Sequence, residues 1–259
     1  MSGWQSREIA IDDAKVVLLE AGEGRPLLIL HDELGPAEWQ NWHGDLARHR
    51  RLIMPIAPGF RAERFKWMRN VTDLSRLYGR LFRQLALGPL DVVGFSFGGW
   101  VAAEMAVNDP TQFRRAAFIA PFGIKPSEGY ITDMYILTTA EYLKMSVADV
   151  DATPEFGSLY TSAAPAVIES WEDGRIETAQ LGWEPYMHNP ALPWHLRGAA
   201  PLEALIVWGD KDAILPRSAV DAYTQALPGA RLEVLKGCGH RPEIERREDF
   251  VRLITRFMD

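Results

Sequence analysis

A serine enclosed by glycines carries the clearest chemical signal in the chain. The pentapeptide GFSFG occupies residues 94–98, directly after the apolar run 90–93 and at the start of the helical pattern 98–108. A strand that turns at once into a helix leaves no room for side chains beside the turn, and glycine meets that requirement. Ser96 would project from this turn, where the helix dipole and the Phe97 N–H favour a developing negative charge. The context therefore predicts a nucleophilic serine.

A serine hydroxyl needs a base to remove its proton, and His240 is the candidate among six histidines. It ends the loop KGCGH (236–240), which lies between the last predicted strand and the last predicted helix. Open α/β sheets place their chemistry at the carboxyl ends of the strands. A carboxylate should orient the imidazole, and both Asp210 and Asp212 follow a predicted strand at that same edge.

Eight short segments have the composition of β-strands. They are residues 6–12, 15–22, 26–31, 50–57, 90–96, 113–121, 204–210 and 230–237. Residues 6–12 alternate apolar and polar side chains, which is typical of a half-exposed edge strand. The other segments are nearly continuous apolar runs, as in parallel strands that are buried on both faces.

Helical patterns separate these strands at 72–87, 98–108, 216–227 and 242–258, with Thr72 as the predicted N-cap of the first. Alternating strands and helices predict an α/β fold with a mostly parallel sheet. The alternation stops between about residues 122 and 200, where we expect short helices at 129–145, 163–172 and 175–187. Residues 123–198 contain eleven acidic and four basic residues, so this segment carries a charge of −7, equal to that of the whole chain. We interpret it as a helical insertion.

Composition excludes several classes of protein. With 259 residues, 47% of them hydrophobic and 24% charged, the chain suits one globular core with an insertion. An acidic chain without a basic stripe is a poor partner for nucleic acid, and no apolar run is long enough to span a membrane. A single cysteine, Cys238, and no signal-peptide pattern favour a cytoplasmic location. No motif demands an oligomer, and a homodimer stays open.

These motifs resemble the α/β-hydrolase superfamily over nearly the whole chain. The matching pieces are PLLILH, MPIAPGF, VVGFSFGGW, FIAPFG, VWGDKDAILP and GCGHRPEIERREDF. The resemblance implies an eight-stranded sheet with a core of residues 1–122 and 199–259, and a helical cap of residues 123–198 between strands six and seven. The order Ser96, Asp212, His240 matches the triad order of this superfamily, and Asp210 is the second choice for the acid.

One turn departs from the family pattern. Relatives read His-Gly-x after the third strand, and the amide of x completes the oxyanion hole together with the amide after the serine. This chain reads HDELG at 31–35, which assigns the two donors to Glu33 and Phe97. A carboxylate pointing at the oxyanion would oppose its charge. Activity therefore requires Asp32 and Glu33 to turn away, to be neutralised or to have another role.

The sequence thus predicts a serine hydrolase that needs no cofactor and no metal and acts on a small-molecule substrate. Hydrolysis of an ester or lactone of a small to medium, partly apolar acid is the first hypothesis. Hydrolysis of a carbon–carbon bond, as in meta-cleavage-product hydrolases, is an alternative; it needs a cation for the substrate carboxylate, and the candidates are Arg175, Arg197 and Arg241. Perhydrolase or haloperoxidase-like activity and a non-catalytic binding protein are further alternatives.

Other residues allow weaker predictions. Tyr135, Trp183 and Met187 are candidates for the substrate pocket, although most aromatic side chains of the cap should form its own core. Cys238 should be a small packed residue. Arg241 should pair with Glu243 or Glu245 at the start of the last helix.

Overall fold

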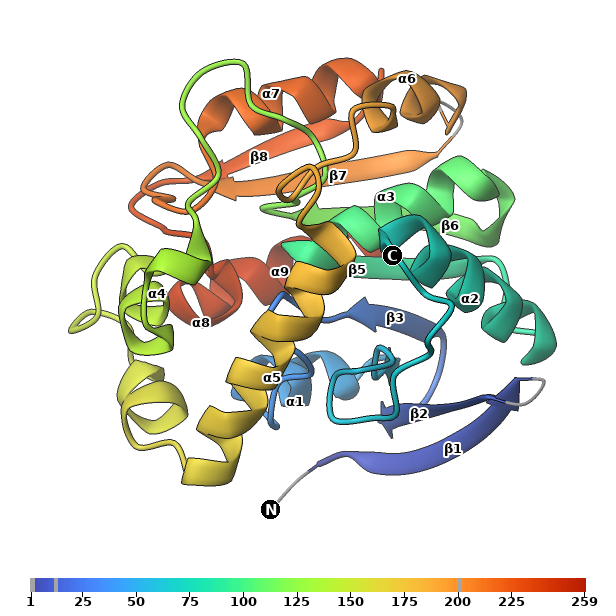
Figure 1. Cartoon of the computed structure of the whole chain (residues 1–259), viewed down its shortest axis with the longest axis horizontal. Coiled ribbons are helices and arrows are strands. Elements are labelled where there is room, and N and C mark those ends of the chain that lie inside the picture. Colours follow the sequence, from blue (N-terminus) through green and yellow to red (C-terminus); the bar gives the residue numbers. More distant parts are fainter. Residues whose placement is uncertain (1–2, 12–13, 200–201) are drawn as a thin grey trace.

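The computed structural model describes residues 3–11, 14–199 and 202–259. An eight-stranded sheet runs through the molecule in the order β1-β2-β4-β3-β5-β6-β7-β8 (Figure 1). The strands are β1 Gln5–Ile11, β2 Ala14–Ala21, β3 Pro26–Leu30, β4 Arg51–Pro55, β5 Leu90–Phe95, β6 Phe113–Ile119, β7 Glu203–Gly209 and β8 Arg231–Leu235. All eight predicted strand segments are confirmed, except that Asp12 lies outside the described residues.

Strand direction explains the burial pattern. β2 is antiparallel to both β1 and β4, and all the other neighbouring pairs are parallel. Every residue of β5 is buried, whereas β1 is exposed over most of its length. The central strands therefore bring their carboxyl ends to one edge of the sheet, where the loops that follow β3, β5, β7 and β8 meet.

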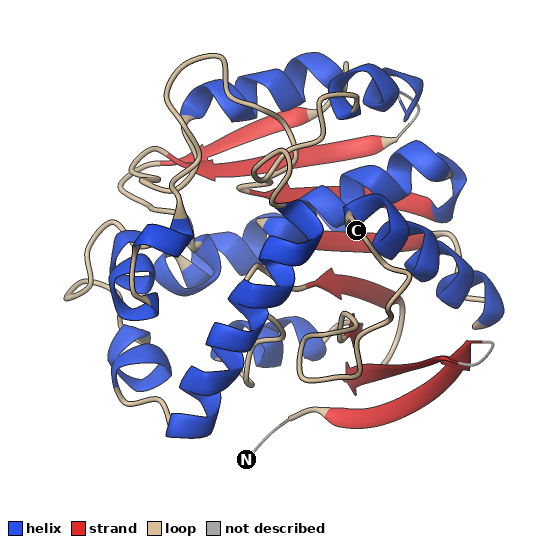
Figure 2. Cartoon of the chain, in the orientation of Figure 1, coloured by secondary structure: helices blue, strands red, loops and turns tan. Residues whose placement is uncertain are grey.

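Helices cover both faces of this sheet (Figure 2). They are α1 Asn41–Ala47, α2 Val71–Gln84, α3 Phe97–Asn108, α7 Arg217–Ala226, α8 Pro242–Glu245 and α9 Arg247–Met258. In Figure 1, α2 and α3 pack together in front of the sheet, and α1 and α9 pack together behind it. The side chains of α3 are buried nearly all round, as expected of a central helix without an amphipathic face.

Three details of the core helices differ from the sequence prediction. The N-cap of α2 is Asn70, whose side chain accepts a hydrogen bond from the Asp73 amide, and not Thr72. Residues 242–258 form two helices, because the chain bends at Arg246. Helix α1 was not predicted; it has seven residues, and its start depends on a reciprocal contact between Gln40 and His43.

The segment between β6 and β7 is helical, as predicted, and residues 123–198 are called the cap below. It contains the short turns η2 Met134–Ile136, η3 Gly157–Thr161 and η4 Arg197–Ala199, and the helices α4 Thr139–Met145, α5 Pro165–Gly182 and α6 Leu192–Leu196. The predicted helix at 129–145 is wrong over residues 129–133 and 137–138, which lie outside η2 and α4. The two predicted helices at 163–172 and 175–187 are one helix, α5, and residues 163–164 and 183–187 lie outside it.

Gly174 explains why α5 continues where the prediction broke it. A Cβ atom at Gly174 would lie 2.3 Å from the backbone oxygen of Leu34. The glycine lets α5 press against the turn that follows β3, and this contact offsets the poor helix propensity of glycine. One cap helix therefore lies directly on the turn that departs from the family pattern.

Candidate active site

Ser96 occupies a strained position at the junction of β5 and α3. Its backbone has φ 49° and ψ −108°, a conformation that a residue with a side chain rarely adopts. A Cβ atom at Gly94 would lie 2.5 Å from Gly98 O, and one at Gly98 would lie 2.2 Å from Leu30 O. The glycines thus allow backbone to meet backbone, which holds the sharp turn and directs Ser96 to the edge of the sheet.

The structure brings three of the predicted side chains together. His240 Nε2 lies 2.9 Å from Ser96 Oγ, and His240 Nδ1 lies 2.8 Å from Asp212 Oδ2. The other carboxylate oxygen of Asp212 accepts the amide hydrogens of Ile214 and Leu215, at 2.8 and 2.9 Å. Asp212 is therefore fixed in place and faces the imidazole.

Asp210, the second choice for the acid, is held elsewhere. Its carboxylate accepts a hydrogen bond from the Gly237 amide at 2.6 Å. This bond ties the loop after β7 to the loop after β8, which carries His240. Asp210 therefore stabilises the contact between these two loops, and Asp212 is the carboxylate in contact with the imidazole.

The protonated form of His240 is favoured by its surroundings. Burial opposes the charged ring, but the charge and the hydrogen bond of Asp212, helped by the charge of Glu33, outweigh it. The pKa of His240 therefore lies above its ordinary value of 6.5. An imidazole that is oriented by a carboxylate and stabilised as the cation is suited to take the serine proton.

The backbone amides of Phe97 and Glu33 are the two predicted oxyanion donors. Phe97 is the first residue of α3, so its N–H has no partner within the helix. Asp32 O accepts the Gly35 amide hydrogen at 3.2 Å, which closes a turn after β3. The Leu34 amide donates to Asp32 Oδ1 at 2.9 Å. This leaves the Glu33 amide as the second candidate donor, as the sequence suggested.

One arginine contacts both acidic side chains of this turn. Arg241, directly after His240, places its Nη1 2.5 Å from Asp32 Oδ2 and its Nη2 3.5 Å from Glu33 Oε1. Its Nη1 also lies 3.9 Å from Glu243. The predicted pairing of Arg241 with Glu243 is therefore confirmed as a long ion pair, but the main partner of Arg241 is Asp32, which the prediction did not include.

Glu245 has a different role from the predicted one. Its carboxylate accepts amide hydrogens from Ala148 and Gly239, at 2.8 and 2.9 Å. It therefore ties the cap to the loop that carries His240, and it meets Arg241 only through the Arg241 amide, at 3.4 Å.

Glu33 faces the reacting groups and not the solvent. It is completely buried, and its Oε1 accepts a hydrogen bond from the Tyr142 hydroxyl of the cap at 2.6 Å. Burial favours the neutral acid, but Arg241, His240, Ser96 and Tyr142 together outweigh it and lower the pKa of Glu33. The sequence analysis missed Tyr142, because nothing in a cap helix 109 residues away signals this contact.

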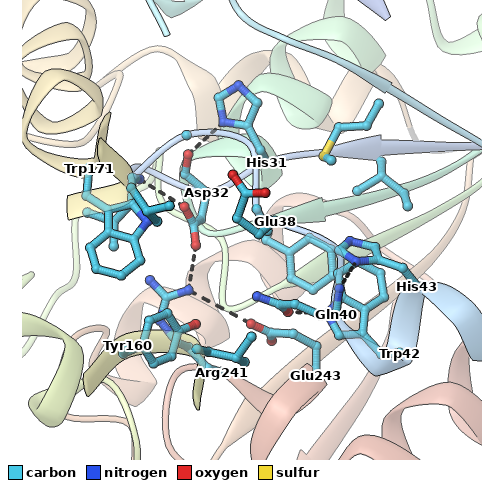
Figure 3. Close-up of a pocket in the computed structure, with 18 residues that line it drawn as sticks. His31, Asp32, Glu38, Gln40, Trp42, His43, Tyr160, Trp171, Arg241 and Glu243 are labelled. Carbon is cyan, nitrogen blue, oxygen red and sulfur yellow. Dashed lines mark hydrogen bonds and ion pairs between the residues drawn. The ribbon is translucent and has the colours of Figure 1, made fainter. Parts of the chain in front are cut away.

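A cavity of about 60 Å³ is lined in part by the same turn (Figure 3). Asp32, Arg241 and Glu243 form part of its polar wall, and Tyr160 and Trp171 of the cap form part of its apolar wall. Ser96 is not among its lining residues. Burial raises the pKa of Glu243 to about 7, against the opposing charge of Arg241.

The three predicted pocket residues have mixed surroundings, and their role stays a prediction. Met187 is fully buried, Trp183 is 53% exposed, and Tyr135 is half-buried and stacks edge-on against Trp183. None of the three lines the cavity of Figure 3. Cys238 is buried, as predicted for a packed residue.

The three arginines predicted as candidate partners of a substrate carboxylate all contact other groups of the protein. Arg175 donates through its two Nη atoms to Thr139, Glu172 and the Met134 and Leu137 carbonyls. Arg197 is exposed and lies over the Trp194 ring, 4.6 Å from its centroid. Together with Arg241, which is paired with Asp32, these side chains already have partners.

Neither a metal site nor a membrane span is found in the part of the chain that the structure describes. No group of three or more His, Cys, Asp or Glu side chains there is arranged to hold a metal ion. Both ring nitrogens of His31, at the start of the acidic turn, contact backbone atoms. Its Nε2 accepts the Ala57 amide hydrogen, and its Nδ1 lies 2.8 Å from Asp32 O. No helix among the described residues is long and apolar enough to cross a bilayer.

The sheet order, the strained serine turn between β5 and α3 and the helical cap are the features of an α/β-hydrolase. The model of the alpha/beta hydrolase family matches residues 22–253, and the chain belongs to this family. A 2-hydroxymuconate semialdehyde hydrolase of Pseudomonas sp. (strain CF600) is 26% identical over 97% of this chain and 93% of its own length.

Solved structures show the same fold. A 2-hydroxy-6-oxo-6-phenylhexa-2,4-dienoate hydrolase from Rhodococcus has a TM-score of 0.76 and 21% identity, covering 100% of this chain and 99% of its own. A bacterial membrane phospholipase A has a TM-score of 0.79 and 20% identity, covering 99% of this chain and 86% of its own. Enzymes named for different bonds thus share this architecture, and the fold alone does not select the substrate.

Proposed function

We propose that the protein is a serine hydrolase in which Ser96 is the nucleophile, His240 the general base and acid, and Asp212 the residue that orients His240. The observation that carries the proposal is the continuous contact from Asp212 through His240 to Ser96, at 2.8 and 2.9 Å. Such a relay, at a strained turn beside a helix N-terminus, is the arrangement that activates a serine.

The reaction follows from these contacts. Ser96 Oγ attacks a carbonyl carbon while its proton passes to His240 Nε2, and the amides of Phe97 and Glu33 bind the oxyanion. The bond to the leaving group breaks, and the leaving group takes the proton from His240. Water, deprotonated by His240, then hydrolyses the ester on Ser96 and restores the free serine.

Hydrolysis of a carbon–carbon bond is the first candidate reaction. It is supported by the relative named as a 2-hydroxymuconate semialdehyde hydrolase, which aligns over 97% of this chain. In this reaction the bond between the attacked carbonyl carbon and its carbon neighbour breaks, and the leaving carbon accepts the proton.

Ester or lactone hydrolysis is the second candidate, and the pairing of the cations favours it. A substrate that carries a carboxylate needs a positive partner. Arg241 is bound to Asp32, and Arg175 to Glu172 and backbone carbonyls. An ester or lactone without a carboxylate can bind without breaking any of these contacts.

Labelling with a fluorophosphonate, followed by mass spectrometry, tests the shared mechanism. We expect stoichiometric modification of Ser96, no modification in Ser96→Ala, and a loss of turnover of about 10³-fold or more in that variant. Ser158→Ala, at an exposed serine of the cap, is the matched control. The rates of turnover of a vinylogous diketone and of a simple ester are then compared. This comparison distinguishes carbon–carbon bond hydrolysis from ester hydrolysis.

Two outcomes would contradict the proposal. Full turnover by Ser96→Ala would remove the serine mechanism. Absence of labelling in a folded protein would favour a non-catalytic binding protein, and direct ligand-binding measurements would then replace the substrate panel.

A further inference from the structure

A carboxylate beside the reactive serine has one oxygen without a partner. Glu33 Oε1 is held by Tyr142 and lies near Arg241. Glu33 Oε2 is also buried, but it accepts no hydrogen bond of normal geometry from the described residues. The Ser96 hydroxyl lies close enough to this carboxylate to help stabilise its charged form. A buried acceptor without a partner is costly, and it calls for a donor that arrives with a ligand.

The charges around Glu33 indicate what kind of donor this is. Arg241 faces three carboxyl groups, those of Asp32, Glu33 and Glu243. Glu243 Oε2 is likewise buried without a hydrogen-bond partner among the described residues. One cation among three acids leaves an excess of negative charge and of acceptor atoms. The site therefore repels an anionic group and attracts a cationic one.

We propose that Glu33 determines substrate specificity by binding a protonated amine that lies next to the carbonyl group attacked by Ser96. This inference rests on the proposed function, since it takes Ser96 as the nucleophile. The ammonium group donates a charge-assisted hydrogen bond to Glu33 Oε2, while Tyr142 and Arg241 hold Oε1 and fix the orientation of the carboxylate.

The same contact resolves the electrostatic conflict in the acidic turn. In the free protein, the Glu33 charge lies close to Ser96 and opposes an oxyanion there. A substrate ammonium cancels this charge at the moment the oxyanion forms. A neutral substrate leaves the charge in place, so the preference should affect the chemical step as well as binding.

Three phosphonate probes of matched shape test this inference on the full chain. They carry the same leaving group on phosphorus and differ in one terminal group, which is a primary ammonium, an uncharged methyl or a carboxylate. The second-order rate constant for modification of Ser96 is measured for each. We expect the ammonium probe to react about tenfold to a hundredfold faster than the methyl probe, and the carboxylate probe to react slowest.

Variants locate the preference. Glu33→Gln keeps the size of the side chain and removes its charge, so the ratio of ammonium to methyl rate constants should fall to near one. Glu33→Asp retracts the carboxylate and should lower the ratio partway, which gives a second readout if Glu33→Gln does not fold. Glu203→Gln, at an exposed position at the start of β7, should keep the wild-type ratio.

The failure of this inference is distinguishable from failure of the proposed function. If the wild-type protein reacts at Ser96 with all three probes at similar rates, or fastest with the carboxylate, the role of Glu33 is overturned and the serine mechanism stands. A preference for the ammonium probe that survives in both Glu33 variants also overturns it. If no probe modifies Ser96, the proposed function fails and this inference fails with it.

Discussion

Two turns at the same edge of the sheet are built in opposite ways. The serine turn, residues 94–99, is made of small residues and aromatic neighbours, and it is held by backbone atoms that approach each other closely. The acidic turn, residues 31–35, carries two carboxylates. Its Asp32 and Glu33 side chains meet Arg241 from the histidine loop and Tyr142 from the cap.

The comparison separates local from distant control of a site. The strained conformation of Ser96 is set by glycines within three residues of it. The position of Glu33 depends on α5, since the Thr178 hydroxyl donates to Glu33 O at 2.8 Å and Gly174 lies against Leu34 O. The conformation of Ser96 is thus set by its own segment, whereas the acidic turn is held by contacts with residues more than a hundred positions away.

The largest effect on this comparison should come from Arg241→Met. The variant leaves three carboxyl groups around an uncharged side chain, and we expect a loss of about 3–5 kcal/mol in the free energy of unfolding at neutral pH. The loss should shrink as the pH falls, because the carboxyl groups then become neutral. Urea unfolding at a series of pH values measures it.

Arg217→Met is the matched control for that measurement. Arg217 pairs with Asp221 on the surface of α7, with both side chains nearly half exposed, so its loss should stay below about 1 kcal/mol. An equal loss in the two variants would show that the Arg241 cluster contributes no more than an ordinary surface pair.

A smaller effect is expected from Gly98→Ala in the serine turn. The new methyl group would lie 2.2 Å from Leu30 O and 2.4 Å from His31 O, so the backbone must shift, at a cost of about 1–3 kcal/mol. Gly198→Ala is the control, because no atom lies within 4 Å of its added Cβ. Thermal unfolding compares the two, and a similar midpoint for both would mean that the serine turn is not tightly packed.

The smallest expected effect is a change in the pH dependence of Ser96 modification when Glu33 of the acidic turn is replaced. Glu33 helps to raise the pKa of His240, so Glu33→Gln should lower that pKa, because the imidazolium loses a stabilising negative charge. Ser96 modification requires neutral His240, and the acidic limb of its pH profile should therefore move to lower pH in the variant. A limb that stays in place, or moves to higher pH, would show that Glu33 does not act on the base.

The sheet could be predicted because the apolar runs carry the necessary information locally. Residues 90–96 or 204–210 are recognisable from composition alone, and buried parallel strands leave little choice for such segments. The order Ser96, Asp212, His240 could likewise be predicted from the sequence. Only the fold shows that Asp212, and not Asp210, reaches the imidazole.

The cap and the acidic turn were less predictable for one shared reason. The break expected before Arg175 is absent because Gly174 packs on Leu34, a contact that no local pattern reports. The outcome at Glu33 depends on Tyr142 and Arg241, which lie 109 and 208 residues away. Where a segment is stabilised by such partners, propensity and motif are a weak guide.

The hydrogen bond from Thr178 to Glu33 O couples the position of the cap to the turn that carries the proposed oxyanion donor. If α5 lifted from this turn, the peptide next to the Glu33 amide would lose that support, so the rate of the proposed reaction would depend on the population of molecules with the cap in place. Once the lifted form predominates, each further shift of about 1.4 kcal/mol in its favour would lower the rate tenfold without touching Ser96, His240 or Asp212.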